Sequence, residues 1–187
     1  MLDFKVKENL QAMKKDQKLF DRIKQLRKVE ILVGIPEAKS KRRRGEMNNA
    51  TLLYIHTKGS PLKNLPARPL IEPALEAPDN SDRIAADLKA VGKAIIEEKF
   101  TEAERLMRIT GQDAVNMIHN WFDDPRNGWP PDTKETVMAK LRKTKKKLAE
   151  RQEMINDYLE GKEDINTTLV DTNQMRRSIT YVLRKTK

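Results

Sequence analysis

The fold is decided by residues 169–187, which read Leu169-Val-Asp-Thr-Asn-Gln-Met-Arg-Arg-Ser-Ile-Thr-Tyr-Val-Leu-Arg-Lys-Thr-Lys187. Asp171 and Thr172 can bond their own backbone and Asn173 tolerates a positive φ, so the stretch is expected to begin with a short helical turn. From Ile179 to Leu183 every second residue is Ile, Tyr or Leu, which is the period of a strand with one buried face. A polar turn and a strand carry no catalytic chemistry, so this stretch indicates a role in assembly.

A partner strand is expected at residues 29–35, where Val29-Glu-Ile-Leu-Val-Gly-Ile35 is β-branched and alternating and is followed by Pro36. Residues 3–28 have the pattern of an amphipathic helix that either packs on its own sheet or docks on a neighbour. The apolar positions that define its face are Val6, Leu10, Met13, Phe20 and Ile23.

A short helix is expected from Asn48 or Asn49 through Ile55, with Gly59 closing it in a left-handed conformation. Between residues 61 and 78 the five prolines fix φ and favour extended backbone, so a stiff extended arm is predicted there. The prolines of this arm are Pro61, Pro66, Pro69, Pro73 and Pro78.

Three longer helices should follow the arm. The first opens at Ser81, and the second begins at the capping box Thr101-Glu-Ala-Glu104 and stops before Pro125. The third is expected to run from about Thr133 to Leu159. Together with the strands, these helices predict an α+β fold.

Four blocks of the sequence carry a resemblance. In chain order they are Val33-Gly-Ile-Pro36, Leu65-Pro-Ala-Arg-Pro-Leu-Ile-Glu-Pro-Ala-Leu75, Trp129-Pro-Pro-Asp-Thr-Lys-Glu-Thr-Val-Met-Ala-Lys140 and the stretch from 169 onward. They resemble the virion-morphogenesis and tail-completion family of tailed bacteriophages, whose members lie in the neck of the particle. Leu70 replaces the aromatic residue of the family's "PARPF", and Asn173 replaces the glycine of its "IDTGQLRRSITY". Ile55-His-Thr-Lys-Gly59 departs further, because relatives carry a Glu and an aromatic residue there.

The resemblance covers residues 29–184 and implies a structural protein that does no catalysis and needs no cofactor. It also implies a small antiparallel or mixed sheet, built from the strand at 29–35 and the final strand with or without one further strand, that is covered by the long helices from 81 and 101. It implies a homo-oligomeric ring, six-fold, that joins the DNA-filled head to the tail in the virion neck, after assembly in the host cytoplasm. The partners implied are portal or adaptor proteins and tail tube or sheath proteins. Contacts within or between subunits are expected from Pro66, Arg68, Pro69, Asp171, Thr172, Arg176 and Arg177.

The length of 187 residues favours one domain with extensions. We expect an N-terminal helix over 1–28 and a single domain over 29–187, with a helical insertion near 144–168. Charged residues make up 35% of the chain and aromatic residues 5%, which favours solvated helices or surfaces that partners bury. The absence of cysteine excludes disulfides, and no apolar run approaches the roughly 20 residues that span a bilayer, so a soluble protein is expected.

The net charge of +10 favours contact with DNA or with an acidic protein surface. Two basic clusters are candidates for that contact, and each is equally well explained as a solvated surface. Their candidate residues are Arg42, Arg43, Arg44, Lys145, Lys146 and Lys147. The alternative function is therefore a small basic nucleic-acid-binding protein that grips phosphates with these clusters.

The residues that usually carry catalysis are sparse. His56 and His119 have no second ligand at metal spacing, so a structural role is expected for His119 and an exposed position for His56. Asp123 and Asp124 lack the further ligands of a cation loop, and are expected either to face solvent or to pair with a neighbouring subunit. No metal site and no enzymatic activity are expected. Trp121 and Trp129 should pack a helix against a loop or bind a partner.

Overall fold

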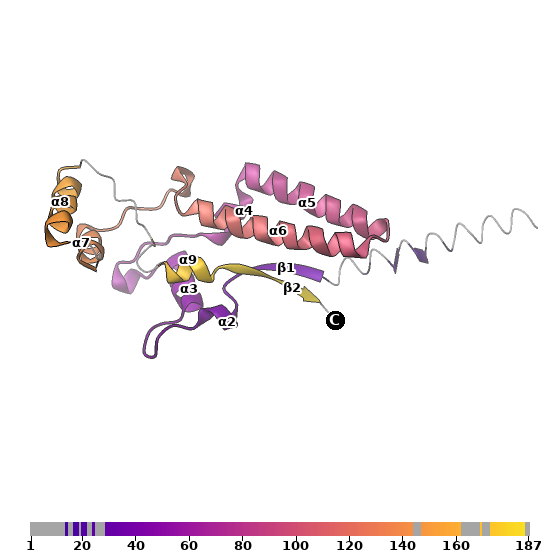
Figure 1. Cartoon of the computed structure of the whole chain (residues 1–187), viewed down its shortest axis with the longest axis horizontal. Helices are drawn as coiled ribbons and strands as arrows, with labels where there is room; N and C mark the ends of the chain where they lie inside the picture. The colour runs from indigo at the N-terminus through magenta and orange to yellow at the C-terminus, as the bar shows by residue number, and fades with distance from the viewer. Residues whose placement is uncertain are drawn as a thin grey trace, which may run out of the picture. The chain divides into compact units, whose positions relative to one another are not determined.

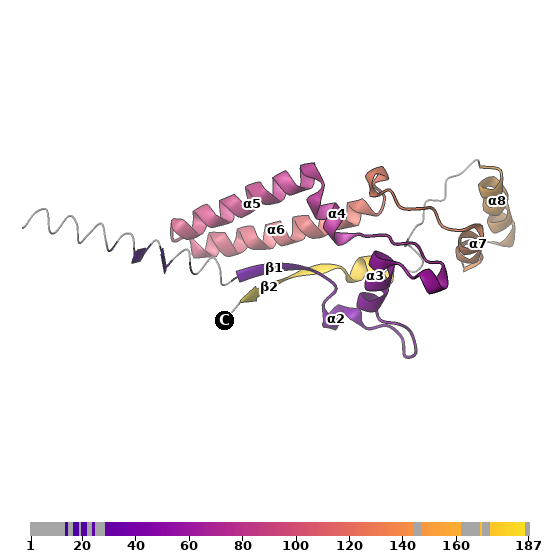
Figure 2. The same cartoon turned by 180° about the vertical axis from the view of Figure 1, so that it is seen from behind.

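The computed structural model describes residues 29–143, 147–161, 169 and 173–185, together with six residues of the N-terminal segment: Lys14, Gln17, Lys18, Phe20, Asp21 and Lys24 (Figure 1, Figure 2). The described residues are rich in helix and include a two-stranded antiparallel sheet, so the fold is α+β. They form two compact units. Unit 1 is the described part of Met1–Gly34, Leu75–Met117 and Thr180–Lys187, and unit 2 is that of Ile35–Ala74 and Ile118–Ile179.

Unit 1 is built on the sheet. Strand β1 (Val29–Gly34) pairs antiparallel with β2 (Thr180–Lys185), with Val29 opposite Lys185 and Gly34 opposite Thr180. Helix α5 (Pro78–Ile96) and residues 100–117 of α6 (Phe100–Trp121) run along the strands in both views. Both strands were expected from their alternating patterns, and both expectations are confirmed.

The core of unit 1 lies between the helices and one face of the sheet. Ile31 of β1 and Leu183 of β2 are register partners and pack against this core. Their neighbours Leu32 and Val182 point to the other face and are exposed, as the period of two in a strand requires. The buried residues that form the core are Val91, Ala94, Ile95, Ala103 and Met107.

Unit 2 consists of short helices joined by well-bonded loops. Asn48 caps α3 (Asn49–Lys58) by accepting a hydrogen bond from the Thr51 amide, as the sequence predicts, and the helix runs three residues past Ile55. The other elements that lie in unit 2 wholly or in part are α2 (Glu37–Ser40), η1 (Pro61–Lys63), α4 (Ile71–Glu76), the end of α6 from residue 118, η2 (Pro125–Asn127), α7 (Lys134–Lys143), α8 (Leu148–Leu159) and α9 (Gln174–Ser178).

The prediction of a single helix from Thr133 to Leu159 is wrong. Lys147 has extended backbone and is the N-cap of α8, so α7 and α8 are separate helices. They pack on each other through Val137, Leu141 and Ile155, which are all buried. A continuous helix would leave these side chains without that contact and would stack the like charges of the lysine run one turn apart.

The proline arm is shorter than expected. Residues 71–76 form α4, because Pro73 sits in its first turn, where the missing amide hydrogen costs nothing. Pro78 likewise occupies the first position of α5, which therefore begins three residues before Ser81. The prediction of a capping box at Thr101 is also wrong, because α6 already begins at Phe100 and Glu104 pairs with Arg108 instead.

Parts of the expected organisation fall on residues outside the described ranges. This is so for most of the helix expected over 3–28, although the six described residues of that segment are helical. The single domain over 29–187 and the insertion near 144–168 stay predictions. None of the described helices is long and apolar enough to cross a membrane.

Gly111 allows α6 to approach β2. A Cβ atom there would lie 2.4 Å from Cδ2 and 2.6 Å from Cγ of Tyr181. Because Cγ is close to the root of that side chain, Tyr181 cannot swing its ring away without leaving its packing. We therefore expect Gly111→Ala to lower the free energy of unfolding by about 1–3 kcal/mol, as overpacked cores do.

Gly92 of α5 is the matched control, because a Cβ atom there would meet no atom within 4 Å. Gly92→Ala should stabilise the protein by up to about 1 kcal/mol through helix propensity alone. Urea denaturation of the two variants measures both effects. Equal stabilisation by the two substitutions would contradict the close packing of α6 on Tyr181.

Candidate functional site

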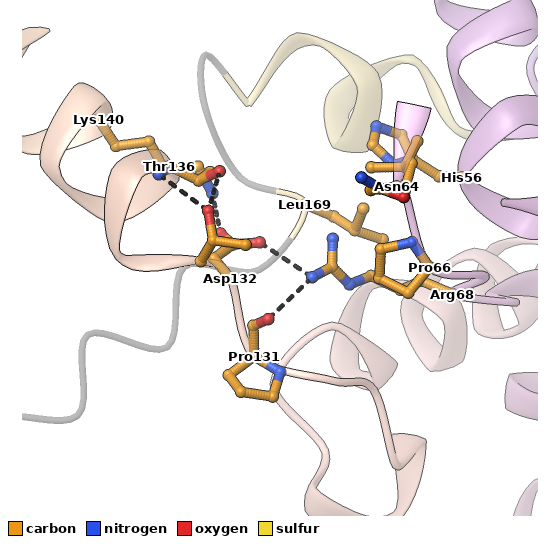
Figure 3. Close-up of a pocket in the computed structure, with 11 residues that line it drawn as sticks. His56, Asn64, Pro66, Arg68, Pro131, Asp132, Thr136, Lys140 and Leu169 are labelled. Atoms are coloured by element: carbon orange, nitrogen blue, oxygen red, sulfur yellow. Dashed lines mark hydrogen bonds and ion pairs between the residues drawn. The ribbon is translucent and has the colours of Figure 1, made fainter. Parts of the chain in front are cut away.

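A pocket of about 390 Å³ lies in unit 2 between the proline arm and the start of α7 (Figure 3). His56, Arg68, Asp132 and Lys140 are the titratable residues that line it. Arg68 and the loop before α7 belong to two of the sequence blocks that carry the family resemblance. The pocket therefore lies where these two blocks meet.

The arm is fixed to the end of α3 by backbone contacts. Gly59 has φ of 72°, and a Cβ atom on it would lie 2.8 Å from the backbone nitrogen of Ala67. The close approach of the arm thus requires glycine at this turn. One residue after Ala67, the Arg68 amide donates to the His56 carbonyl at 2.7 Å. This bond holds the base of the Arg68 side chain, which is directed into the pocket (Figure 3).

Arg68 ties the arm to the loop that precedes α7. Its Nε and Nη2 atoms donate to the Pro130 carbonyl at 3.2 and 2.9 Å, and Nη2 also reaches the Pro131 carbonyl at 3.3 Å. A second bond runs the other way, because Trp129 Nε1 donates to the Pro69 carbonyl at 2.9 Å. Segments about sixty residues apart in the sequence are therefore joined by side-chain to backbone bonds. As the sequence predicts, Arg68 is a hydrogen-bonding residue.

Asp132 is shared by two cations. Its carboxylate lies 3.1 Å from Arg68 Nη2 and 2.6 Å from Lys140 Nζ. The side chains of Arg68 and Asp132 are only 5% and 8% exposed, so the pair sits where the dielectric constant is low and partners matter most. The cluster carries one net positive charge, and its members bind one another and the main chain.

His56 is half-buried, not exposed as expected. Its Nδ1 atom is buried and has no hydrogen-bond partner among the described residues. Burial lowers the pKa of His56 below its ordinary value, and the charges of Arg68 and Lys140 lower it further, against the opposing charge of Asp132. The imidazole is therefore neutral near pH 7.

A second arginine joins α9 to the end of α6 within unit 2. Arg176 Nη2 donates to the His119 carbonyl at 2.8 Å and pairs with Asp123 at 2.9 Å. In return, His119 Nε2 donates to the Arg176 carbonyl at 2.9 Å, so His119 has the structural role expected of it. The Arg176 guanidinium also lies 4.9 Å from the centre of the Phe122 ring. Asp123 thus has its cation within the chain.

The two tryptophans pack a helix against a loop, which is the first of the two roles predicted for them. Trp121 is buried, and the Trp129 ring meets Phe122 edge to face at 5.9 Å between centroids. Asp124 is paired as well, with Arg126 of its own loop. The acidic residues after α6 therefore have their cationic partners inside this chain.

The basic loop after α2 is held at its two ends. Ser40 Oγ donates to Asn48 Oδ1 at 3.0 Å and accepts from the Ala50 amide at 3.2 Å. Arg43 and Arg44 between these ends are exposed, but Arg42 is half-buried and lines a small cavity beside Leu52 and Met175. Arg42 thus has apolar neighbours, which the sequence does not indicate.

The remaining predicted site residues have simpler positions. Pro66 and Arg177 are exposed, and so is Lys147 at the start of α8. Asp171, Thr172, Lys145 and Lys146 lie outside the described residues. Sequence reasoning missed Asp132, Lys140 and His56 as neighbours of Arg68, and the only signal for them is the block Trp129–Lys140 itself.

Comparison of the chain with protein families, with curated proteins and with solved structures found no match. Among the described residues, no group of three or more His, Asp or Glu side chains is placed to hold a metal ion.

Removing the Arg68 guanidinium should destabilise the protein strongly. Arg68→Ala leaves Asp132 buried with one cation fewer and strands the Pro130 carbonyl, so we expect a loss of about 3–5 kcal/mol in the free energy of unfolding. Arg68→Lys should rescue little of this, because an ammonium cannot present the planar fork that spans two carbonyls.

Arg83→Ala is the control. Arg83 pairs with Asp113 at 2.7 Å but is 62% exposed, so its loss should cost about 1 kcal/mol or less. Urea unfolding of the three variants measures these losses in the free energy of unfolding. A cost for Arg68→Ala as small as that for Arg83→Ala would contradict the structural role of the buried cluster.

His56 should make stability depend on pH. Its pKa in the folded protein is below the unfolded value of about 6.5, so the unfolded chain takes up the proton first. Stability should therefore fall as pH is lowered from 7 to 5. The exposed carboxylates with lowered pKa, such as Glu102, act only at lower pH.

His56→Gln should have a flatter dependence of unfolding free energy on pH across that window. Urea unfolding at several pH values from 5 to 7 measures the two slopes. The same slope in both proteins would show that His56 is not the group that titrates.

Proposed function

We propose that this protein is a structural component of the neck of a tailed bacteriophage, where a ring of copies joins the DNA-filled head to the tail. The observation that carries the proposal is the way the resemblance blocks contact one another. Arg68 of the second block bonds to the Pro130 and Pro131 carbonyls of the third, and Trp129 of the third bonds back to Pro69. The blocks are thus parts of one physical framework and not independent short matches.

The chemistry of the pocket supports a structural role over a catalytic one. Arg68, Asp132 and Lys140 are bound to one another, and Arg68 also to backbone carbonyls. Charged groups committed in this way orient segments and resist unfolding. They make a poor general acid or nucleophile, which needs an accessible group with its pKa matched to the reaction. In this proposal the protein is not an enzyme.

The surfaces left for partners are the exposed residues of the same blocks and the basic loop. In the proposed ring, Pro66 and Arg177 are exposed positions available to a neighbouring copy, a portal or adaptor protein, or a tail tube or sheath protein. Arg43 and Arg44 are exposed on a loop whose ends are fixed. Such a loop can present positive charge to packaged DNA or to an acidic partner at little cost in ordering.

Deleting the gene from the phage genome that carries it should separate heads from tails. Electron microscopy of the lysate should show DNA-filled heads and complete tails that are not joined, and infectious titre should be lost. Both should return when the wild-type chain is supplied from a plasmid. Normal joined particles in the deletion lysate would refute the neck assignment.

The same complementation tests the basic loop, on which the alternative of a nucleic-acid-binding protein depends. Arg43→Ala with Arg44→Ala should leave thermal stability unchanged and reduce DNA-filled joined particles. The charge-matched control is Arg105→Ala with Arg108→Ala, since these residues are also exposed and form their ion pairs with Glu102 and Glu104 of their own helix. Full activity of the loop variant in assembly would remove the basic loop from the proposal.

A further inference from the structure

An apolar groove lies in unit 1 beside β1. Its volume is about 640 Å³, and it is lined by Ile31 and Val33 of the strand, Ile84 and Leu88 of α5, and Met107 of α6. Leu88 follows Ile84 by one helical turn, yet its side chain is 47% exposed. An apolar side chain on the face of a helix that points to its own sheet is normally covered. Something that covers Leu88 is therefore missing from the described residues.

The edge of β1 that faces away from β2 is uncovered as well. Among the described residues, β1 pairs with β2 alone. In an antiparallel pair, alternate residues turn their backbone groups away from the partner, so this edge presents free donors and acceptors. Proteins protect such edges by pairing them or by laying a helix or loop over them.

A carboxylate of α5 indicates which charge would suit an occupant of the groove. Asp87 lies on the same face of α5 as Ile84 and Val91, by the spacing of three and four residues. Its Oδ2 atom is buried and has no hydrogen-bond partner among the described residues. The carboxylate does not line the groove, but its negative charge is carried one residue before Leu88 and favours a basic occupant over an acidic one.

The N-terminal segment has the amphipathic pattern and the positive charge that suit the groove. Residues 1–28 contain nine basic and four acidic residues, and their sequence predicts an amphipathic helix. All six described residues of this segment are helical and exposed, and Phe20 is 61% exposed. The segment thus offers an apolar face and positive charge, and its largest described apolar side chain has no covering.

The connection to β1 decides which copy's segment fits. No Gly, Pro, Asn or Asp lies between Arg22 and Val29, so the sequence provides no turn that would reverse the chain before the strand. A helix over 3–28 is about 39 Å long, and without a reversal it leads away from the groove beside its own β1. It is long enough to reach another copy.

We propose that the groove between β1, α5 and α6 binds the N-terminal helix of a second copy of this chain, with Phe20 seated beside Leu88. The contact is heterologous, because the helix of one copy meets the groove of the next. Contacts of this kind close into rings when the rotation allows it. The proposal rests on the ring proposed above and names the surfaces that would join its neighbours.

The absence of cysteine makes a clean cross-linking test possible. Full-length Phe20→Cys with one tag and full-length Leu88→Cys with a tag of another size are mixed and treated with a short bis-maleimide. Ala86→Cys replaces Leu88→Cys in the control, because Ala86 is exposed on the same helix but two residues away, on another face. The mixtures are treated as purified protein and, where joined particles form in the complemented deletion phage, within those particles.

The expected product is the mixed dimer of Phe20→Cys with Leu88→Cys. It should form at least about tenfold faster than the product with Ala86→Cys, because docking raises the effective concentration of the two thiols. The proposal is overturned if the mixed dimer forms no faster than the control in either setting. It is also overturned if the double variant Phe20→Cys with Leu88→Cys cross-links only within one chain.

The two proposals fail in different ways. Joined particles that require the gene but yield no mixed dimer would refute the docking and leave the neck function standing. A mixed dimer from a protein that is dispensable for joining would do the reverse.

Discussion

Unit 2 depends on one buried guanidinium. Arg68 is 5% exposed and binds two proline carbonyls and the Asp132 carboxylate at the same time. Pro130 and Pro131 have no amide hydrogen, so the loop they form cannot be tied down by its own donors there. A side chain with several donors in a fixed plane fills that need. The arm and the loop before α7 take their relative position from this residue.

Asp132 makes the arrangement stable by lying between Arg68 and Lys140. Two cations that share one buried carboxylate depend on it for compensation, and each helps to hold the other in place. His56, on the rim of the same cluster, stays neutral because burial lowers its pKa and the charges of Arg68 and Lys140 lower it further. Arg176 has a similar role in the stretch from 169 onward, where it binds both the His119 carbonyl and Asp123. In both places an arginine joins a loop or helix end to a segment distant in sequence.

Much of the fold follows from local sequence signals. The alternation in β1 and β2, the Asn48 cap and the stop before Pro125 depend on a few neighbouring residues, and each is present in the structure. The errors arise where tertiary contacts decide. The break at Lys147 exists because α8 packs back on α7 through Ile155 and Leu141. Likewise, Pro73 and Pro78 occupy helix starts, which the count of prolines alone does not distinguish from an extended arm.

The candidate site was less accessible to sequence reasoning. The importance of Arg68 and Arg176 came from the resemblance blocks, but their partners had no local signal. Asp123 shows the difficulty, because a neighbouring subunit was one predicted source of its cation and the structure supplies Arg176 from 53 residues away in the same chain. Partners separated so far in sequence become visible only when the chain is folded.

The pairing of β1 with β2 also governs when the protein can fold. Glu30 and Arg184 lie opposite each other and are 154 residues apart. During synthesis β1 emerges before β2 and waits without this partner strand until residues 180–185 have been translated. The loop that must close is long, so the sheet forms late and by a slow, non-local step. The nascent chain therefore exposes the apolar strand β1 until β2 has been made, which makes it a natural client for chaperones at the ribosome.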